Sequence, residues 1–154
     1  MTTVKELKVS AIENGTVIDH ISPKNVFQVI KLLNLEVFDN QIFVGTNLES
    51  KKFGKKGIIK VSNRYFENDE INKIALIAPY ATLIVIKDYQ VIEKRTVDLP
   101  EKIQGIVKCV NPNCITNVET ITQKFNVLSK EPVKLRCHYC EKTTEESNME
   151  FIKR

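Results

Sequence analysis

The chain has 154 residues, 42% of them hydrophobic and 27% charged, and a formal net charge of +4. This length suits one ordinary domain or two small ones. No apolar run approaches the roughly 18–20 residues needed to cross a bilayer, and the charged start MTTVKELKVS is unlike a signal peptide. We therefore expect a cytoplasmic protein.

The positive charge is spread evenly, since residues 1–100 and residues 101–154 carry +2 each. Neither part has the concentrated basic stripe with which a general nucleic-acid binder neutralises many phosphates. The charge distribution therefore argues against that class.

The first hundred residues alternate between strand and helix patterns. Asn14-Gly15 is a hairpin turn signal, Ser22-Pro23 is typical of a helix start, and Pro79 ends a second helical pattern. The predicted elements are strands at 7–11 and 16–21, a helix at 23–33, strands at 41–46 and 57–62, a helix with its cap and first turn at 68–70 and its apolar face at 71–78, and strands at 82–86 and 90–95. This order predicts an α+β fold, a ferredoxin-like antiparallel sheet with two helices on one face.

Pro100 interrupts both strand and helix patterns, so we place the domain boundary there and expect domains at 1–99 and 100–154. The second part has almost no helical periodicity. Its β-prone segments are 103–108, 118–121, 124–127 and 133–135, which predict a small all-β domain. A domain this small buries too little apolar surface to fold well unaided.

All four cysteines of the chain fall in two tight pairs in this second part. The spacing is Cys109-x4-Cys114, then 22 residues, then Cys137-x2-Cys140. Two close pairs can place four sulfurs around one tetrahedral zinc ion, and four thiolates leave no position for water. We predict one structural Zn²⁺. A redox Cys-x-x-Cys or four unrelated buried cysteines would not explain why every cysteine falls in a tight pair. We expect that His138 does not bind the metal, because four thiols are already available.

Several segments of the chain, from about residue 7 to residue 142, follow a known pattern in order and spacing. They are Ala11-Ile12 with GTVIDHI after it, Gly45-x-Asn47-Leu48-x-Ser50, Ala78-Pro79-x-Ala81-Thr82, Leu99-Pro100-Glu101, and the cysteine knuckles CVNPNCI and CHYCE. Together they resemble the regulatory chains of aspartate carbamoyltransferase.

The resemblance implies a non-catalytic regulatory subunit that controls pyrimidine biosynthesis. Its N-terminal allosteric domain would bind CTP or ATP and pair with a second regulatory chain. Its zinc domain would dock on the catalytic chains, in an assembly of two catalytic trimers with three regulatory dimers.

The resemblance also implies a nucleotide site. Its residues would be Ala11, Ile12, Asp19, His20, Lys56, Lys60, Ile86, Tyr89, Val91 and Lys94. Asp19 could accept hydrogen bonds from both ribose hydroxyls. Lys56, Lys60 and Lys94 come from three predicted strands and could converge on the phosphates. His20 would add a donor that titrates near neutral pH.

The resemblance further implies that the edge of the base forms hydrogen bonds with the backbone of Ala11, Ile12 and Tyr89. Ile86 and Val91 would form its apolar wall. Taken without the resemblance, the apolar residues would be core and the lysines solvated.

Two residues depart from the pattern of the family. Glu6 stands where basic residues can assist phosphate binding, and Ile84 stands where a polar residue can serve the phosphates. Both bear on which triphosphate is preferred.

The zinc knuckles carry four further residues that could contact the catalytic chain: Asn111, Asn113, Glu141 and Lys142. A rigid loop bearing amides and charges suits docking on another subunit. Asn and Pro also build such turns without any partner.

Two other classes of protein stay open. A zinc-ribbon nucleic-acid-binding module would show affinity that falls steeply with salt. A small enzyme is disfavoured, since the chain has two histidines, no Gly-rich phosphate loop and a closed metal site.

Overall fold

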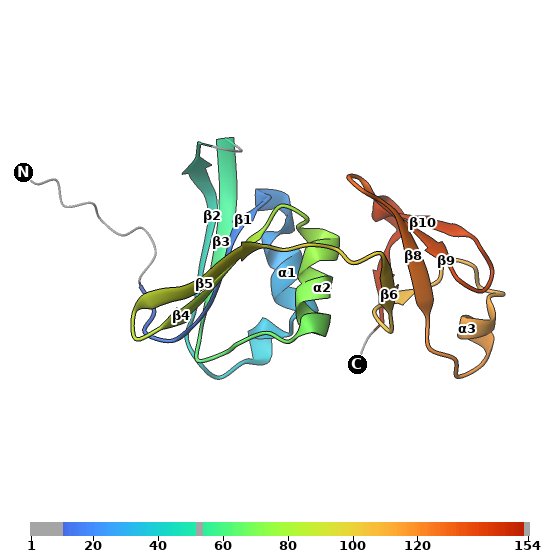
Figure 1. Cartoon of the computed structure of the whole chain (residues 1–154), viewed down its shortest axis with the longest axis horizontal. Helices are drawn as coiled ribbons and strands as arrows, with labels where there is room; N and C mark the ends of the chain where they lie inside the picture. Colours follow the sequence, from blue (N-terminus) through green and yellow to red (C-terminus); the bar gives the residue numbers. More distant parts are fainter. Residues whose placement is uncertain (1–10, 52–53, 153–154) are drawn as a thin grey trace, which may run out of the picture. The chain divides into compact units, whose positions relative to one another are not determined.

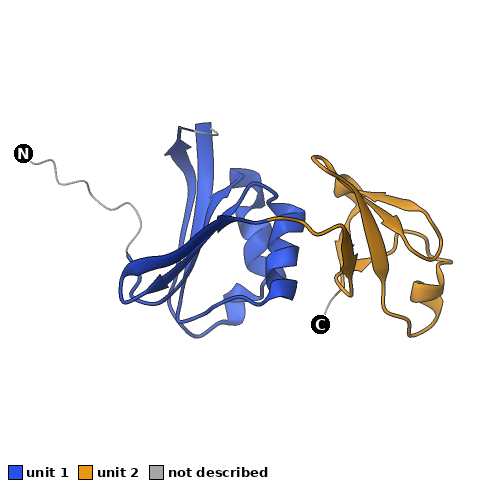
Figure 2. Ribbon diagram, viewed as in Figure 1, with its two compact units in different colours: residues 1–97 blue, residues 98–154 orange. Residues whose placement is uncertain are grey.

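The computed structural model describes residues 11–51 and 54–152. The chain divides into two compact units, residues 1–97 and residues 98–154 (Figure 2). Glu6 and the strand predicted at 7–11 lie outside the described residues, apart from Ala11, which belongs to no strand.

The first unit is a five-stranded antiparallel sheet with two helices on one side (Figure 1). Its elements are β1 (Gly15–Ile21), η1 (Pro23–Asn25), α1 (Val26–Leu32), η2 (Leu35–Val37), β2 (Ile42–Ser50), β3 (Gly54–Ser62), α2 (Asn68–Ile77), β4 (Thr82–Lys87) and β5 (Gln90–Thr96). The strand order is β2-β3-β1-β4-β5. This confirms the predicted α+β class, and β5 extends the ferredoxin-like sheet by one strand.

The hairpin of β2 and β3 is longer than predicted. Pairing continues from Leu48↔Lys56 to Ser50↔Gly54 beyond a bulge that follows Gly45. The lysines and glycines there signal a loop, but ladder hydrogen bonds override that local preference.

The core of the first unit lies between the sheet and the helices. Ile18 of β1 and Ile59 and Val61 of β3 are completely buried, as are Val26 of α1 and Ile74 of α2. Burial of such side chains contributes about 1.5–3 kcal/mol each. The core therefore fixes which face of the sheet the helices cover.

The second unit is a small all-β domain, as predicted. Its elements are β6 (Lys102–Gln104), β7 (Val107–Lys108), α3 (Ile115–Val118), β8 (Lys124–Lys130), β9 (Val133–Cys137), β10 (Thr143–Glu145), η3 (Glu146–Asn148) and β11 (Glu150–Phe151). One sheet has the order β10-β9-β8-β6, and β11 pairs with β7. Gly105, with φ +73°, divides the predicted strand at 103–108 into β6 and β7.

The strand predicted at 118–121 is wrong. Residues 115–118 form the single turn α3, and the Asn117 N–H donates to the carbonyl of Cys114. Local hydrogen bonds beside a cysteine knuckle override the β propensity of Val118 and Ile121 here.

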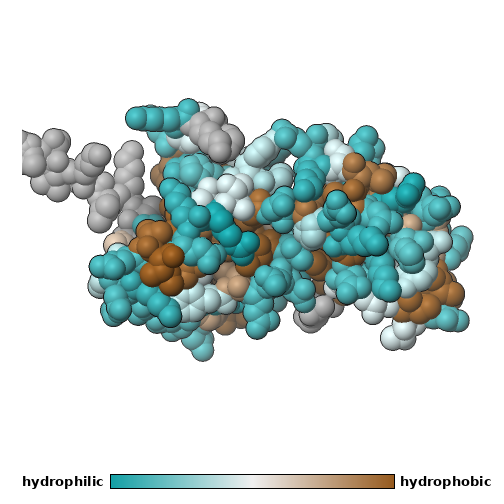
Figure 3. Space-filling view, in the orientation of Figure 1, coloured by the Kyte–Doolittle hydropathy of each residue, from teal (hydrophilic) through white to brown (hydrophobic). Residues whose placement is uncertain are grey.

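Most of the visible surface of both units is hydrophilic, with smaller hydrophobic patches (Figure 3). No helix in the described parts of the chain is long and apolar enough to cross a membrane.

A close approach of α1 to β3 at Gly57 gives a testable prediction. A Cβ on Gly57 would overlap Cγ2 of Val26. Overpacking of this kind costs typically about 1–3 kcal/mol. We expect Gly57→Ala to lower the protection of β3 amides against hydrogen exchange, and to do so far less when Val26→Ala makes room. An equal effect of Gly57→Ala in both backgrounds would contradict the contact.

Candidate functional site

Four cysteine sulfurs come together in the second unit. Cys109 follows β7, Cys114 precedes α3, Cys137 ends β9, and Cys140 lies in the turn before β10. The four Sγ atoms all lie within 4.8 Å of one another. The Cys109–Cys140 and Cys114–Cys137 sulfur pairs are 3.5 and 3.6 Å apart.

These distances fit a tetrahedral metal ion. Zn–S bonds of about 2.3 Å place neighbouring sulfurs about 3.8 Å apart. A disulfide would need about 2.05 Å, and all four cysteines are free. The donor set is therefore that of a closed, structural zinc site.

The pKa values of the thiols also indicate that a cation is needed to keep all four sulfurs deprotonated. Burial raises the pKa of Cys109 to about 12 and raises the pKa of Cys137 as well. Burial acts in the same direction on Cys140, but hydrogen bonds from the Lys142 backbone and the Asn111 side chain lower its pKa to about 7. Four adjacent thiolates are stable only beside a compensating ion, which Zn²⁺ supplies.

Asn117 holds the first knuckle in shape, a role that the sequence alone did not reveal. Its Nδ2 donates to the carbonyls of Cys109 (3.0 Å) and Asn111 (2.7 Å). The Thr116 hydroxyl lies 3.2 Å from Sγ of Cys114. The available signal was an asparagine three residues after the second cysteine, within reach of the loop carbonyls.

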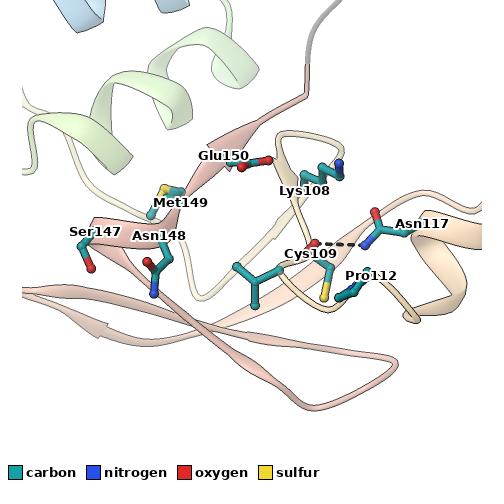
Figure 4. Close-up of a pocket in the computed structure, with 9 residues that line it drawn as sticks. Lys108, Cys109, Pro112, Asn117, Ser147, Asn148, Met149 and Glu150 are labelled. Atoms are coloured by element: carbon teal, nitrogen blue, oxygen red, sulfur yellow. Dashed lines mark hydrogen bonds between the residues drawn. The ribbon is translucent and has the colours of Figure 1, made fainter.

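A pocket of about 750 Å³ lies beside this knuckle (Figure 4). Its lining includes Val110, Pro112 and Asn117 from the knuckle side, and Met149 and Glu150 from the C-terminal side. The pocket combines apolar and charged groups next to the metal centre.

The four predicted contact residues of the knuckles differ in exposure. Asn113, Glu141 and Lys142 are exposed. Asn111 is half-buried, and its Oδ1 accepts a hydrogen bond from the Asn113 N–H at 3.0 Å. The turn-building role of Asn111 is therefore real, whatever else it contacts.

In the first unit, the strand register gathers five of the ten predicted nucleotide residues on one face: Asp19, Lys60, Ile86, Val91 and Lys94. We call it the helix-free face, because it is opposite to the face that packs on α1 and α2. It carries three cross-strand rows. They are Ser62–Gly15–Ile86–Val91, then Lys60–Val17–Ile84–Lys94, and then Asp19–Thr82–Thr96. Successive rows lie about 7 Å apart, because side chains two residues apart point to the same face.

Lys60 and Lys94 thus share one row, with Val17 and Ile84 between them. Burial lowers the pKa of Lys60, and the charge of Asp19 acts against this shift. The middle row therefore has a lysine at each end and two apolar side chains between them, and Lys60 is partly desolvated.

Asp19 is held by its neighbours rather than left open. Nζ of Lys56 lies 2.8 Å from its Oδ1, and the backbone N–H of His20 donates to the same oxygen at 2.7 Å. Nδ1 of His20 lies 2.8 Å from the Thr82 hydroxyl, so a bulge in β1 turns the ring toward β4. Thr82 was not among the nucleotide residues predicted from the sequence.

Ala11, Ile12 and Tyr89 line a second pocket, of about 240 Å³. We call it the end pocket. Its other lining residues are Glu13, Asn14, Gln41, Phe43, Ser62 and Asn63. The Tyr89 N–H donates to the carbonyl of Glu13 at 2.8 Å, so this donor is already used.

Comparison with known proteins accounts for both units. Residues 7–98 match the model described as "Aspartate carbamoyltransferase regulatory chain, allosteric domain", and residues 101–150 match the metal binding domain of the same chain. The chain belongs to the family of aspartate carbamoyltransferase regulatory chains. A regulatory chain is a non-catalytic subunit, and the metal binding domain coincides with the cysteine cluster.

Curated relatives carry the same description over nearly their full length. An aspartate carbamoyltransferase regulatory chain of Thermococcus sibiricus is 56% identical over 144 residues, which are 94% of this chain and 95% of the relative. One from Parabacteroides distasonis is 53% identical over 90% of both chains, and one from Pyrococcus horikoshii is 52% identical over 94% and 96%. These matches favour a regulatory chain over a zinc-ribbon nucleic-acid module.

The metal centre yields a prediction about folding. The reduced regulatory chain should contain about one zinc ion, and a strong chelator should abolish amide protection in β8 and β9 while that in β1 and β3 persists. Apparent zinc-binding free energies of roughly 10–16 kcal/mol exceed the stability of most small domains.

Two variants of the second knuckle provide the contrast. Cys140→Ser should lower zinc affinity by more than the ~10–100-fold typical of losing an outer hydrogen-bond partner. His138→Ala should retain zinc, because His138 is exposed and four sulfurs complete the set. Equal zinc loss in both variants would contradict a four-sulfur site.

Proposed function

We propose that the chain binds CTP or ATP on the helix-free face and transmits this binding, through its zinc-held second unit, to the catalytic chains of aspartate carbamoyltransferase. The observation that carries the proposal is the cross-strand register. It brings an apolar row, a basic row and the acidic residue Asp19 onto one face. A nucleotide offers a partner for each of them: a flat base, a charged phosphate chain and, between the two, a ribose diol.

The base is assigned to the end pocket and to the adjoining row that carries Ile86 and Val91. The pocket has a volume of about 240 Å³, below the ~300–1,000 Å³ of pockets that enclose whole drug-sized ligands, so the ribose and phosphates would lie outside it. Because the Tyr89 N–H is engaged, the carbonyl of Tyr89 is the group left to read a base. A carbonyl favours an exocyclic amino group, which cytosine and adenine both carry.

The phosphates are assigned to Lys60 and Lys94, which share the middle row. A triphosphate carries several negative charges and would raise the pKa of Lys60, against the effect of burial. Lys56 acts differently in this proposal. Since it is paired to Asp19 at 2.8 Å, it orients the carboxylate that receives the ribose hydroxyls, and His20 lies beside them.

The zinc ligands in this proposal are Cys109, Cys114, Cys137 and Cys140. The ion supplies a rigid link between the two knuckles, and no chemistry. Asn113, Glu141 and Lys142 are exposed on those knuckles and, with Asn111 shaping the first, are assigned to contact with the catalytic chain. The pocket beside the first knuckle adds a recess for a partner loop.

The assembly and location follow from the family. We propose pairing of two regulatory chains through their allosteric domains, an assembly of two catalytic trimers with three regulatory dimers, and a cytoplasmic location. The allosteric domain would cover residues 1–99 and the zinc domain residues 100–154, close to the division between the two compact units. Effectors would shift the equilibrium between two assembly states because they bind one state more tightly than the other. The coupling free energy is typically about 1–3 kcal/mol.

Calorimetric titration of the full chain with CTP and ATP tests the nucleotide site. We expect saturable binding at submillimolar to millimolar concentration. Lys60→Ala and Lys94→Ala should each weaken it by roughly 10-fold or more, because charge-assisted hydrogen bonds contribute about 1.5–3 kcal/mol.

Lys87→Ala is the matched control. Lys87 is an exposed lysine at the end of β4 and is outside the three rows, so its loss should change affinity less than twofold. The proposal fails if wild-type protein binds neither nucleotide, or if all three lysine variants behave alike.

A further inference from the structure

Asn14 joins the segments that form the end pocket. Its main-chain carbonyl accepts a hydrogen bond from the Asn63 N–H at 2.9 Å, just beyond β3. Its side-chain Oδ1 accepts a hydrogen bond from the Asp88 N–H at 3.1 Å, in the turn between β4 and β5. One residue before β1 thus binds the ends of two hairpins that are 49 and 74 positions away along the chain.

The donors on both sides are residues in unusual conformations. Asn63, Asp88 and Tyr89 have φ values of 59°, 50° and 65°, in the left-handed region that non-glycine residues seldom adopt. Asn and Asp tolerate this region, whereas Tyr rarely adopts it. Asp88 and Tyr89 are the two central residues of the β4–β5 hairpin turn, where positive φ at both positions is usual. The bonds to Asn14 and Glu13 hold this turn in place.

The contact to Asp88 is the one that depends on the identity of residue 14. The bonds from Asn63 to Asn14 and from Tyr89 to Glu13 both end on main-chain carbonyls, which survive substitution. Tyr65 supports the same region through a bond from its hydroxyl to the carbonyl of Ile86 at 3.1 Å. A change at residue 14 can therefore loosen the turn while most of its anchors remain.

We propose that Asn14 is a positioning residue for nucleobase binding. Through its Oδ1 it fixes the turn that holds Tyr89, and so sets the position of Tyr89 in the lining of the end pocket. Asn14 need not touch the base. This inference rests on the proposed nucleotide site, and it adds a determinant that lies outside the predicted set of nucleotide residues.

Calorimetry on the full chain with CTP and with ATP tests the inference in four proteins: wild type, Asn14→Ala, Asn14→Asp and Asn40→Ala. Asn14→Ala should lower the affinity for both nucleotides by roughly 3- to 10-fold, as expected for one lost hydrogen bond. Asn14→Asp keeps an acceptor for the Asp88 N–H and should stay within about twofold of wild type. Asn40, an exposed asparagine before β2, serves as the matched control and should show no change.

Hydrogen exchange at the Asp88 amide provides a second readout that does not need a ligand. Its protection should fall in Asn14→Ala and persist in Asn14→Asp, with β1 and β3 unchanged in both. Loss of protection throughout the sheet in Asn14→Ala would show a general folding role and overturn the inference.

The inference is also overturned if Asn14→Ala binds CTP within twofold of wild type, or if Asn14→Asp is as weak as Asn14→Ala. If wild-type protein binds no nucleotide, the proposed function fails. In that case the exchange result alone decides whether Asn14 holds the turn.

Discussion

Four cysteine sulfurs lie within 4.8 Å of one another in the second unit, and the structure of that unit depends on what neutralises them. Its sheets are short, with strands of two to seven residues. The unit has a small core, which includes Val107, Phe125, Val133 and Leu135. One ion that bonds two knuckles far apart in sequence adds the stability that so small a core does not supply alone. Asn117 then shapes the first knuckle from within, so that the residues exposed on it keep a fixed geometry.

In the first unit, the strand register determines which side chains lie together on the helix-free face. Burial of Ile18, Ile59 and Val61 under the helices leaves the alternate residues of β1 and β3 on the other face. A shift of one residue would exchange the two sets. The apolar core therefore determines, indirectly, that Lys60 and Lys94 share a row with each other.

Much of this organisation could be predicted from the sequence. Hydrophobic periodicity and proline positions identified both helices and the α+β class, and the paired cysteines identified the metal centre. The hairpin of β2 and β3 and the single turn α3 were mispredicted, since pairing across strands and hydrogen bonds to a knuckle override local preference. The roles of Asn14, Thr82 and Asn117 were not predicted, because they arise from hydrogen bonds that appear only once the chain is folded.

We propose that the metal-held second unit carries the effector response to the catalytic chain. The most direct measurement is the rate of carbamoyl-aspartate formation by the reconstituted holoenzyme, with and without CTP, using zinc-loaded chain and chain stripped of metal under reducing conditions. We expect a CTP-dependent rate with zinc-loaded chain, and a rate that does not change with CTP when the chain has been stripped of metal. An equal CTP response from stripped chain, or none from a zinc-loaded chain that binds CTP and assembles, would contradict it.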